Sequence, residues 1–211
     1  MIKKDIIQPI NDLIEKRAKE LKNKIAYADE TEKISYENLN IETKRLSFYL
    51  NEKKLNYGDA ASIILPNSVN WIVSCFAIIR LGCLVVPISY DSTLSEIEYK
   101  LNDSNTKILI TTNEIKDKIK KQLELKNEIQ FITVDDQKAD LNLTKIRKIN
   151  HQSILLKDDI NKPSYILYTS GTTGQPKGVL LTTRGMLWVI ASCWMPIAGL
   201  NENSKVLSPL P

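Results

Sequence analysis

From residue 59 onward, short apolar runs alternate with stretches of helical periodicity, and this alternation constrains the fold more than any other feature. The apolar runs are rich in β-branched residues, as strands are, and the stretches between them repeat apolar residues at helical spacing. Strands and helices in strict alternation predict an α/β fold, in which a parallel sheet with right-handed crossovers has flanking helices. The predicted strands are residues 61–65, 83–89, 107–111 and 129–134, and the predicted helices between them are residues 67–81, 94–101 and 114–125.

Local signals support the individual helices. Thr93 and Glu96 form a capping box, in which the hydroxyl and the carboxylate each bind a backbone N–H at the start of a helix. Residues 67–81 are apolar on nearly every side and predict a buried helix. Another helix is predicted before the alternation begins, over residues 38–54, with Leu39, Leu46 and Leu50 on one side.

The second half of the chain is less regular. Residues 135–162 are polar and predict a loop-rich connection that contains the only histidine, His151. Residues 164–169 predict a strand that leads directly into a segment of glycines and hydroxyl residues. Beyond that segment, residues 179–183 predict a further strand and residues 184–200 predict a buried helix.

Composition and charge exclude several classes of protein. Hydrophobic residues make up 43% of the chain, which is typical of a globular domain. The net charge of +4 is spread along the chain, so neither a nucleic-acid surface nor a nucleic-acid partner is indicated. Charged or proline residues interrupt the apolar stretches before they could span a membrane. Cys75, Cys83 and Cys193 lie in apolar runs, as reduced core cysteines do, and this predicts a cytoplasmic protein.

Residues 168–179 read YTSGTTGQPKGV, a mixture that suits neither a helix nor a strand. Glycines let the backbone approach a ligand closely, and successive N–H groups in such a loop can surround an anion. The hydroxyls add donors, Pro176 restricts the backbone, and Lys177 adds a compact positive charge that suits a phosphate oxygen. The segment therefore predicts a phosphate-binding loop, although a surface loop without a ligand is the alternative.

Two common phosphate motifs do not fit this segment. A P-loop requires a second glycine followed by Lys and then Ser or Thr, whereas Pro176 and Gly178 flank Lys177 here. The dinucleotide fingerprint fails because Gly171, Gly174 and Gly178 have the wrong spacing. The loop therefore belongs to another type.

The loop resembles, nearly letter for letter, the signature loop of the adenylate-forming (AMP-binding) enzymes, which include acyl-CoA ligases, amino-acid adenylation domains and luciferases. Further segments resemble this family in the same order along the chain: ISYENL at 34–39, RLGCLVVPIS at 80–89 and LSEIEYKLNDSNTKILIT at 94–111. The resemblance covers nearly the whole chain. It implies that residues 1–211 are part of the N-terminal domain of the adenylate-forming ligase fold, without the family's later segments and C-terminal domain.

The resemblance also implies a reaction. In the family, the carboxylate of an acid attacks the α-phosphate of ATP, with Mg²⁺ bound to the nucleotide, and gives an acyl-adenylate and pyrophosphate. A thiol acceptor, either CoA or a carrier protein, then takes the acyl group. The loop grips the β- and γ-phosphates and offsets the charge that builds up on the departing pyrophosphate. The family's catalytic lysine is expected beyond Pro211, and the implied ATP-binding residues are Thr169, Ser170, Gly171, Thr172, Thr173, Gly174 and Lys177.

Three hypotheses about function stay open. VVPI at 85–88 and VLLT at 179–182 favour an acyl-CoA ligase, whereas SYILYTSG at 164–171 and TRG at 183–185 also resemble amino-acid adenylation domains. The third hypothesis is a non-catalytic fragment that binds no nucleotide.

Two features bear on these hypotheses. The family often has histidine where Thr183 stands, so a neutral hydroxyl replaces an imidazole at this position. Trp188 and Trp194 lie in the predicted helix 184–200, and a partial domain would leave this apolar helix uncovered. Such a fragment is expected to be inactive alone and to self-associate.

Overall fold

The computed structural model describes residues 2–135, 142–147, 158–169, 175–201 and 203–207. At its centre lies a six-stranded sheet with the order β6-β5-β3-β4-β7-β8. Neighbouring strands from β6 to β7 are parallel, and β8 runs antiparallel to β7 at one edge. The strands are β3 (Ala60–Ile64), β4 (Leu84–Pro87), β5 (Ile108–Thr111), β6 (Gln130–Thr133), β7 (Pro163–Thr169) and β8 (Lys177–Thr182).

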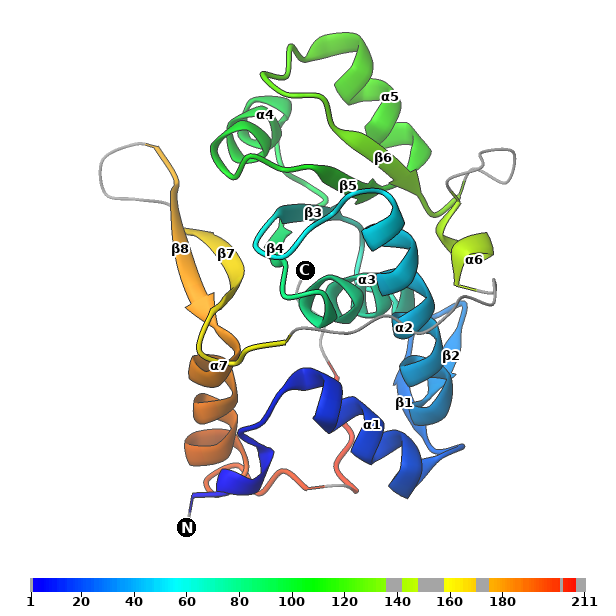
Figure 1. Cartoon of the computed structure of the whole chain (residues 1–211), viewed down its shortest axis with the longest axis vertical. Coiled ribbons are helices and arrows are strands. Elements are labelled where there is room, and N and C mark those ends of the chain that lie inside the picture. Colours follow the sequence, from blue (N-terminus) through cyan, green and yellow to red (C-terminus); the bar gives the residue numbers. More distant parts are fainter. Residues whose placement is uncertain (1, 136–141, 148–157, 170–174, 202, 208–211) are drawn as a thin grey trace.

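Helices cover both faces of the sheet (Figure 1). One layer contains α1 (Ile10–Leu21), α2 (Tyr36–Glu52), α3 (Val69–Arg80) and the short α6 (Leu143–Ile146). The other layer contains α4 (Leu94–Asp103) and α5 (Asn113–Gln122). The remaining elements are a 3-10 turn (Lys4–Ile6), a separate antiparallel pair of β1 (Ile25–Ala28) and β2 (Lys33–Ser35), α7 (Thr183–Val189) and a π-helical turn (Ile190–Trp194).

The residues of β3 explain why two helix layers are needed. Every residue of this strand is buried. Ala61 and Ile63 pack against the layer of α1, α2 and α3, whereas Ala60 and Ile64 pack against α4 and α5. Because successive side chains of a strand point to opposite faces, an unbroken apolar run is stable only when both faces are covered.

The predicted alternation of strands and helices is confirmed, with element ends displaced by a few residues. The capping box is also confirmed, because the Thr93 N–H donates to Glu96 Oε2 at 2.9 Å and the Glu96 N–H donates to Thr93 Oγ1 at 3.4 Å. The strand predicted after the loop is β8, and the helix predicted over residues 38–54 is α2.

The helix predicted over residues 184–200 is shorter than predicted, and its apolar side chains are uncovered, as expected for a partial domain. The helix ends at Val189 and continues as one π-helical turn to Trp194. Trp188 and Trp194 are 45% and 55% exposed, because no described part of the chain packs against that side. Cys193, predicted as a core residue, is exposed on this segment, whereas Cys75 and Cys83 are buried as predicted.

Other elements were not anticipated from the sequence. The amphipathic helix α1 buries Ile10, Ile14 and Ala18, and this spacing was a readable signal. The polar connection of residues 135–162 contains α6, whose Leu143 and Ile146 are buried against the first helix layer. His151 lies outside the described residues. No helix in the described ranges is both long and apolar enough to cross a membrane.

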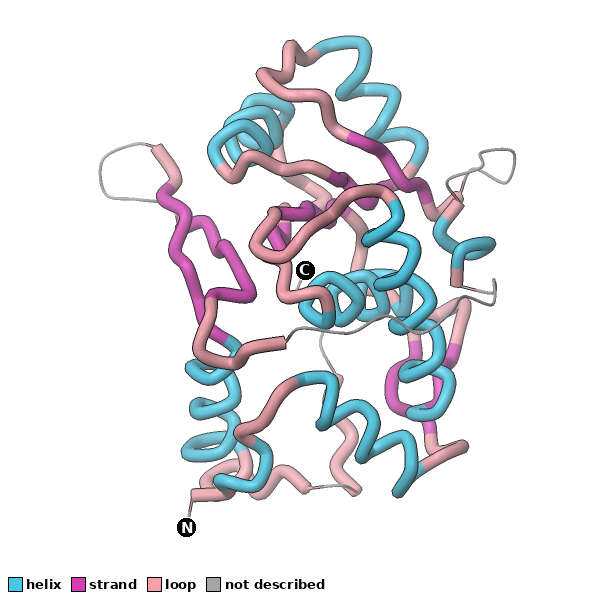
Figure 2. Tube along the Cα trace, viewed as in Figure 1, coloured by secondary structure: helices cyan, strands magenta, loops and turns pink. Residues whose placement is uncertain are grey.

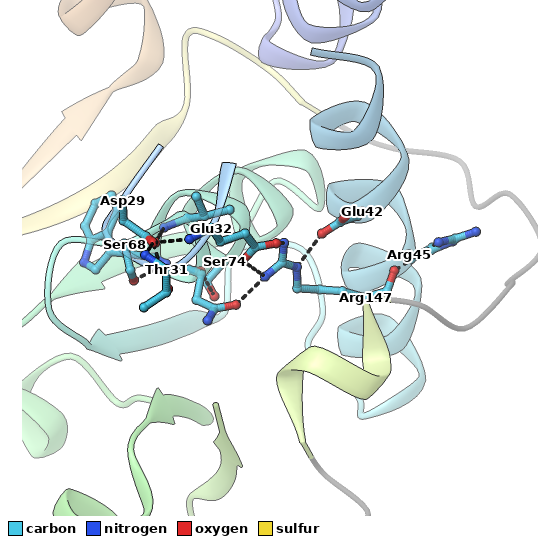
Figure 3. Close-up of polar contacts among 11 residues, drawn as sticks. Asp29, Thr31, Glu32, Glu42, Arg45, Ser68, Ser74 and Arg147 are labelled. Atoms are coloured by element: carbon cyan, nitrogen blue, oxygen red, sulfur yellow. Dashed lines mark hydrogen bonds and ion pairs between the residues drawn. The ribbon is translucent and has the colours of Figure 1, made fainter. Parts of the chain in front are cut away.

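A buried arginine joins α6 to the elements around the start of α3 (Figure 3). The guanidinium of Arg147 donates to both carboxylate oxygens of Glu32, at 2.8 and 3.1 Å, and also to Glu42 and Asn70. Burial acts to lower the pKa of Arg147, but the bonds to Glu32 and Glu42 outweigh burial and raise the pKa. The guanidinium therefore remains charged and links the turn between β1 and β2, α2 and α3 to the end of α6.

Asp29 organises the neighbouring turn between β1 and β2 (Figure 3). Its Oδ1 accepts from the N–H groups of Thr31 and Glu32, both at 2.7 Å, and its Oδ2 accepts from the Val69 N–H at 2.8 Å. Val69 is the first residue of α3, whose N–H has no partner within the helix. Burial acts to raise the pKa of Asp29, but these backbone bonds outweigh burial and hold the pKa below its usual value.

We expect Asp29→Asn to remove part of the pH dependence of stability in acid. The folded-state pKa of Asp29 is lowered from an unfolded value of about 3.9, so its carboxylate stabilises the fold above that value. This contribution is lost as pH falls through the folded pKa. The variant should be less stable by about 1 kcal/mol at neutral pH and nearly equal to wild type in strong acid.

Urea unfolding at neutral and acid pH measures this difference. Asp91→Asn is the matched control, because Asp91 is an exposed aspartate on the surface. A stability loss in Asp29→Asn that stays the same at both pH values would contradict the assigned role.

Candidate functional site

The parallel strands place the predicted loop at the carboxyl edge of the sheet. β3 continues into α3 on one face, and its neighbour β4 continues into α4 on the other face. The chain connections therefore diverge between these two strands, and ligands of open α/β sheets bind in the crevice at such a point. β7 is parallel to β4, with Val85 and Tyr165 paired, so the loop after β7 begins at the same edge.

β7 and β8 form a hairpin (Figure 2), and the predicted loop is the sequence that connects these two strands. Thr169 and Lys177 are directly paired at the connected end of the hairpin, and both are exposed. Directly opposed residues have Cβ atoms about 4.5–5.5 Å apart on one face, so the hydroxyl and the ammonium group start side by side. The other predicted site residues lie outside the described residues: Ser170, Gly171, Thr172, Thr173 and Gly174.

The donors at this hairpin end suit a polyphosphate. Within the described ranges, the side chain of Lys177 has no hydrogen bond or ion pair, so an anion need not displace a local carboxylate to reach the ammonium group. An ammonium group is a compact cation that attracts phosphate oxygens, and bonds to a charged acceptor are stronger than neutral ones. Thr169 adds a hydroxyl on the same face.

The first half of β7 packs against both helix layers, one on each face of the strand. Tyr165 points toward α3, where its hydroxyl lies 3.0 Å from Cys75 Sγ, and Ile166 points toward the layer of α4 and α5. Burial raises the pKa of the Cys75 thiol to about 12, against a smaller opposing effect of the Tyr165 bond. Cys75 is therefore a neutral thiol at physiological pH, and it serves packing rather than nucleophilic chemistry.

Gly178 is required by packing beneath the loop. A Cβ atom at this position would lie 3.0 Å from Cγ2 of Ile166 and 3.3 Å from the ring of Tyr168. The Tyr168 ring therefore lies directly over the backbone of its cross-strand partner, Gly178. The sequence suggested no role for this glycine, and only the strand register reveals it.

The last residue of β8 and the residues that follow it start a helix. Thr182 is the N-cap of α7, and its hydroxyl accepts from the Gly185 N–H at 3.1 Å. Thr183, at the position where the family often has histidine, is buried and donates to Ser164 Oγ at 2.8 Å. This hydroxyl pair ties α7 to the start of β7.

Among the described residues, no group of three or more His, Cys, Asp and Glu side chains is arranged to hold a metal ion. The most connected polar cluster, around Arg147, lies near the start of α3 and was missed from the sequence. Its signal is weak, because Arg147 occurs in the polar connection where no periodicity marks a buried residue.

The sequence profile of the AMP-binding enzyme family matches residues 14–211. The chain belongs to the AMP-binding enzyme family. Gramicidin S synthase 2 of Brevibacillus brevis is 31% identical over 81% of this chain and 4% of its own length. The dimodular nonribosomal peptide synthase of Bacillus subtilis strain 168 is 28% identical over 98% of this chain and 8% of its own length.

Solved structures show the same fold. The o-succinylbenzoate CoA synthetase of Bacillus subtilis, in complex with its acyl-adenylate intermediate, has a TM-score of 0.74 and 24% identity, over 92% of this chain and 47% of that chain. A fatty acyl CoA synthetase of Mycobacterium tuberculosis has a TM-score of 0.72 and 23% identity, over 85% of this chain and 35% of that chain. The AMP-binding chain thus spans less than half the length of these structures and a small part of its curated relatives.

We expect Thr183→Val to destabilise this AMP-binding chain by about 1–2 kcal/mol, because it leaves the buried Ser164 hydroxyl without its donor. The double variant Thr183→Val with Ser164→Ala should recover part of that loss, since both polar partners are then removed. Urea unfolding of the single and double variants measures the difference. A double variant that is less stable than the sum of the singles would show that the hydroxyl pair is not the cause.

Proposed function

We propose that this AMP-binding chain takes part in ATP-dependent activation of a carboxylic acid as its acyl-adenylate, followed by thioester formation with CoA. The observation that supports this most directly is the pairing of Thr169 with Lys177 at the carboxyl edge of the sheet. Both residues belong to the family's signature segment, residues 168–179, and lie near its two ends. The names of two solved neighbours, a CoA synthetase with an acyl-adenylate and a fatty acyl CoA synthetase, agree with this reaction.

Charge development explains the proposed roles of the site residues. When the acid attacks the α-phosphate, negative charge increases on the departing pyrophosphate. A cation and hydroxyl donors held in advance on rigid strands stabilise this charge without rearranging. Lys177 and Thr169 would contact the β- and γ-phosphates from the strand ends, together with Ser170, Gly171, Thr172, Thr173 and Gly174. Mg²⁺ would accompany the nucleotide and neutralise further phosphate charge.

A second candidate is activation of an amino acid for transfer to the thiol of a carrier protein. The relatives at 31% and 28% identity are a gramicidin S synthase and a nonribosomal peptide synthase, and their names favour this alternative over a CoA ligase. The adenylation step is common to both candidates. They differ in the acid and in the thiol acceptor.

We further propose that residues 1–211 form the first part of a larger AMP-binding domain. The family match continues to residue 211, and the chain covers 47% of one solved neighbour and 35% of another. Large apolar side chains with more than a third of their surface exposed gather toward the end of the described chain: Val179, Leu180, Trp188, Val189, Ile190, Trp194, Ile197, Val206 and Leu207. Further segments of the domain would cover these side chains. We call the exposed apolar side chains of α7 and the π-helical turn, namely Trp188, Val189, Ile190 and Trp194, the C-terminal apolar face.

The compartment is also a proposal. Cys75 and Cys83 are buried as free thiols, and free thiols are usual in reducing compartments. We therefore propose that the protein acts in the cytoplasm.

Pyrophosphate exchange tests the function and the role of Lys177. A polypeptide that carries this chain and the rest of the domain should exchange pyrophosphate into ATP only when its acid is present, and residues 1–211 alone should not. Lys177→Ala should lower kcat by roughly ten- to a hundredfold, since a bond to a charged group contributes about 1.5–3 kcal/mol. KM for ATP should change little, because magnesium and the other donors still hold the ground state.

Lys107→Ala is the matched control, because Lys107 is exposed just before β5, at the opposite edge of the sheet. Panels of amino acids, aromatic acids and fatty acids, each with CoA or a carrier protein, separate the two candidates. Absence of exchange with every acid would overturn the proposed function. A raised KM with unchanged kcat in Lys177→Ala would show that Lys177 binds ATP without stabilising the leaving group.

We expect residues 1–211 alone to self-associate through the C-terminal apolar face. Exposed apolar patches beyond about 300–600 Å² are uncommon on monomers and favour association. Sedimentation over a range of concentrations should show association, and replacing Trp188 and Trp194 with serine should weaken it. The control replaces Tyr57 with serine, because Tyr57 is a half-exposed aromatic residue distant in sequence from Trp188 and Trp194. A monomer at all concentrations would contradict the expectation.

A further inference from the structure

The outer half of the β7–β8 hairpin has little support from the rest of the sheet. β7 spans Pro163–Thr169, but its pairing with β4 is limited to Val85 and Tyr165. Beyond Tyr165 the ladder of β7 continues with β8, which is itself an edge strand. Figure 2 shows this hairpin standing apart at the left of the molecule. Side chains must therefore attach its outer half to the body.

Tyr168 makes such an attachment. Its hydroxyl donates to Asp103 Oδ2 at 2.6 Å, and the Lys100 carbonyl oxygen lies 3.5 Å away. Both residues are in the last turn of α4. The rings of Tyr168 and Tyr99 meet edge to face, with their centroids 6.2 Å apart and their planes at 77°. One side chain thus has a charge-assisted hydrogen bond and an aromatic contact with the same helix.

The same ring also fixes β8. It lies over Gly178, where a Cβ atom would come within 3.3 Å of the ring. Tyr168 and Gly178 form the register pair next to Thr169 and Lys177. Because side chains alternate along a strand, Tyr168 faces α4 while Thr169 and Lys177 extend from the opposite face of the hairpin.

We propose that Tyr168 is a positioning residue, whose bond to Asp103 fastens the connected end of the hairpin to α4 and thereby sets the positions of Thr169 and Lys177. The attachment is independent of any ligand. The orientation of Thr169 and Lys177 toward ATP by this attachment rests on the proposed function. A loss of the bond frees the hairpin end from α4, so the β7–β8 ladder opens more often at this end. A displacement of about 1 Å at a reacting group can cost on the order of a hundredfold in rate.

Amide hydrogen exchange on residues 1–211 tests the attachment without any ligand. Tyr168→Phe retains the ring over Gly178 and removes only the hydroxyl. We expect exchange of β8 amides to accelerate at least tenfold, while amides of β3 and β5 keep their rates. The control is Tyr99→Phe, because the Tyr99 hydroxyl has no hydrogen bond with a described residue and its loss leaves the ring contact in place.

The two partners of the bond can be tested together. Asp103→Ala should accelerate exchange in β8 as much as Tyr168→Phe does, and the double variant should be no faster than either single variant. Asp103→Asn keeps a neutral acceptor and should lie between wild type and Asp103→Ala. Additive effects of the two substitutions would overturn the proposal, as would unchanged exchange in β8. Equal acceleration in β3, β5 and β8 would also overturn it, because that result indicates global destabilisation.

A second arm measures pyrophosphate exchange by the polypeptide that carries the whole domain. Tyr168→Phe should lower kcat by roughly ten- to a hundredfold with KM for ATP nearly unchanged, and Asp103→Asn should restore part of the rate lost in Asp103→Ala. If wild type shows no exchange with any acid, the proposed function fails, and the hydrogen-exchange arm still decides the attachment. If amides of β8 accelerate but kcat is unchanged, the positioning of Thr169 and Lys177 by Tyr168 is refuted.

Discussion

Burial of the parallel sheet on both faces is the constraint on which the rest of the structure depends. β3 is apolar on both sides, so it requires α3 on one face and α4 on the other. Since right-handed crossovers place successive helices according to strand order, the connections after β3 and β4 must diverge. The carboxyl edge between them then becomes the place where a ligand can approach backbone and loops. β7, parallel to β4, delivers the signature segment to that edge.

The hairpin that carries the segment extends beyond its pairing with β4, so few backbone contacts connect its outer half to the rest of the sheet. β7 leaves the ladder of β4 after Tyr165, and Thr169 and Lys177 are both exposed. An exposed position would suit the proposed contact with a polyphosphate, but the proposed catalysis would also require that these groups be held in place. The Tyr168 side chain would meet both requirements. It bonds to α4 and packs over Gly178, and it leaves the opposite face of the hairpin exposed.

Charged side chains around the start of α3 are paired with other groups of the protein. Asp29 satisfies the first N–H of the helix, and Arg147 joins four segments through Glu32, Glu42 and Asn70 (Figure 3). These groups are satisfied by each other, which distinguishes them from Lys177 at the hairpin end. The C-terminal apolar face differs again, because its side chains remain exposed in this chain. Polar groups in the interior are thus paired with one another, whereas Lys177 and the C-terminal apolar side chains are exposed.

The α/β class, the strands from β3 to β8, the capping box at Thr93 and the family all followed from the sequence alone. Each depends on short-range patterns, namely apolar periodicity, local side-chain to backbone bonds and a contiguous motif. Contacts between distant segments decided the rest. The Tyr168 bond to Asp103 joins residues 65 apart, and the ion pairs of Arg147 cross even longer separations, so no local pattern marks them. The spacing of Trp188 and Trp194 likewise did not determine their exposure. Periodicity identifies an apolar side of a helix, but it does not show whether another element covers that side.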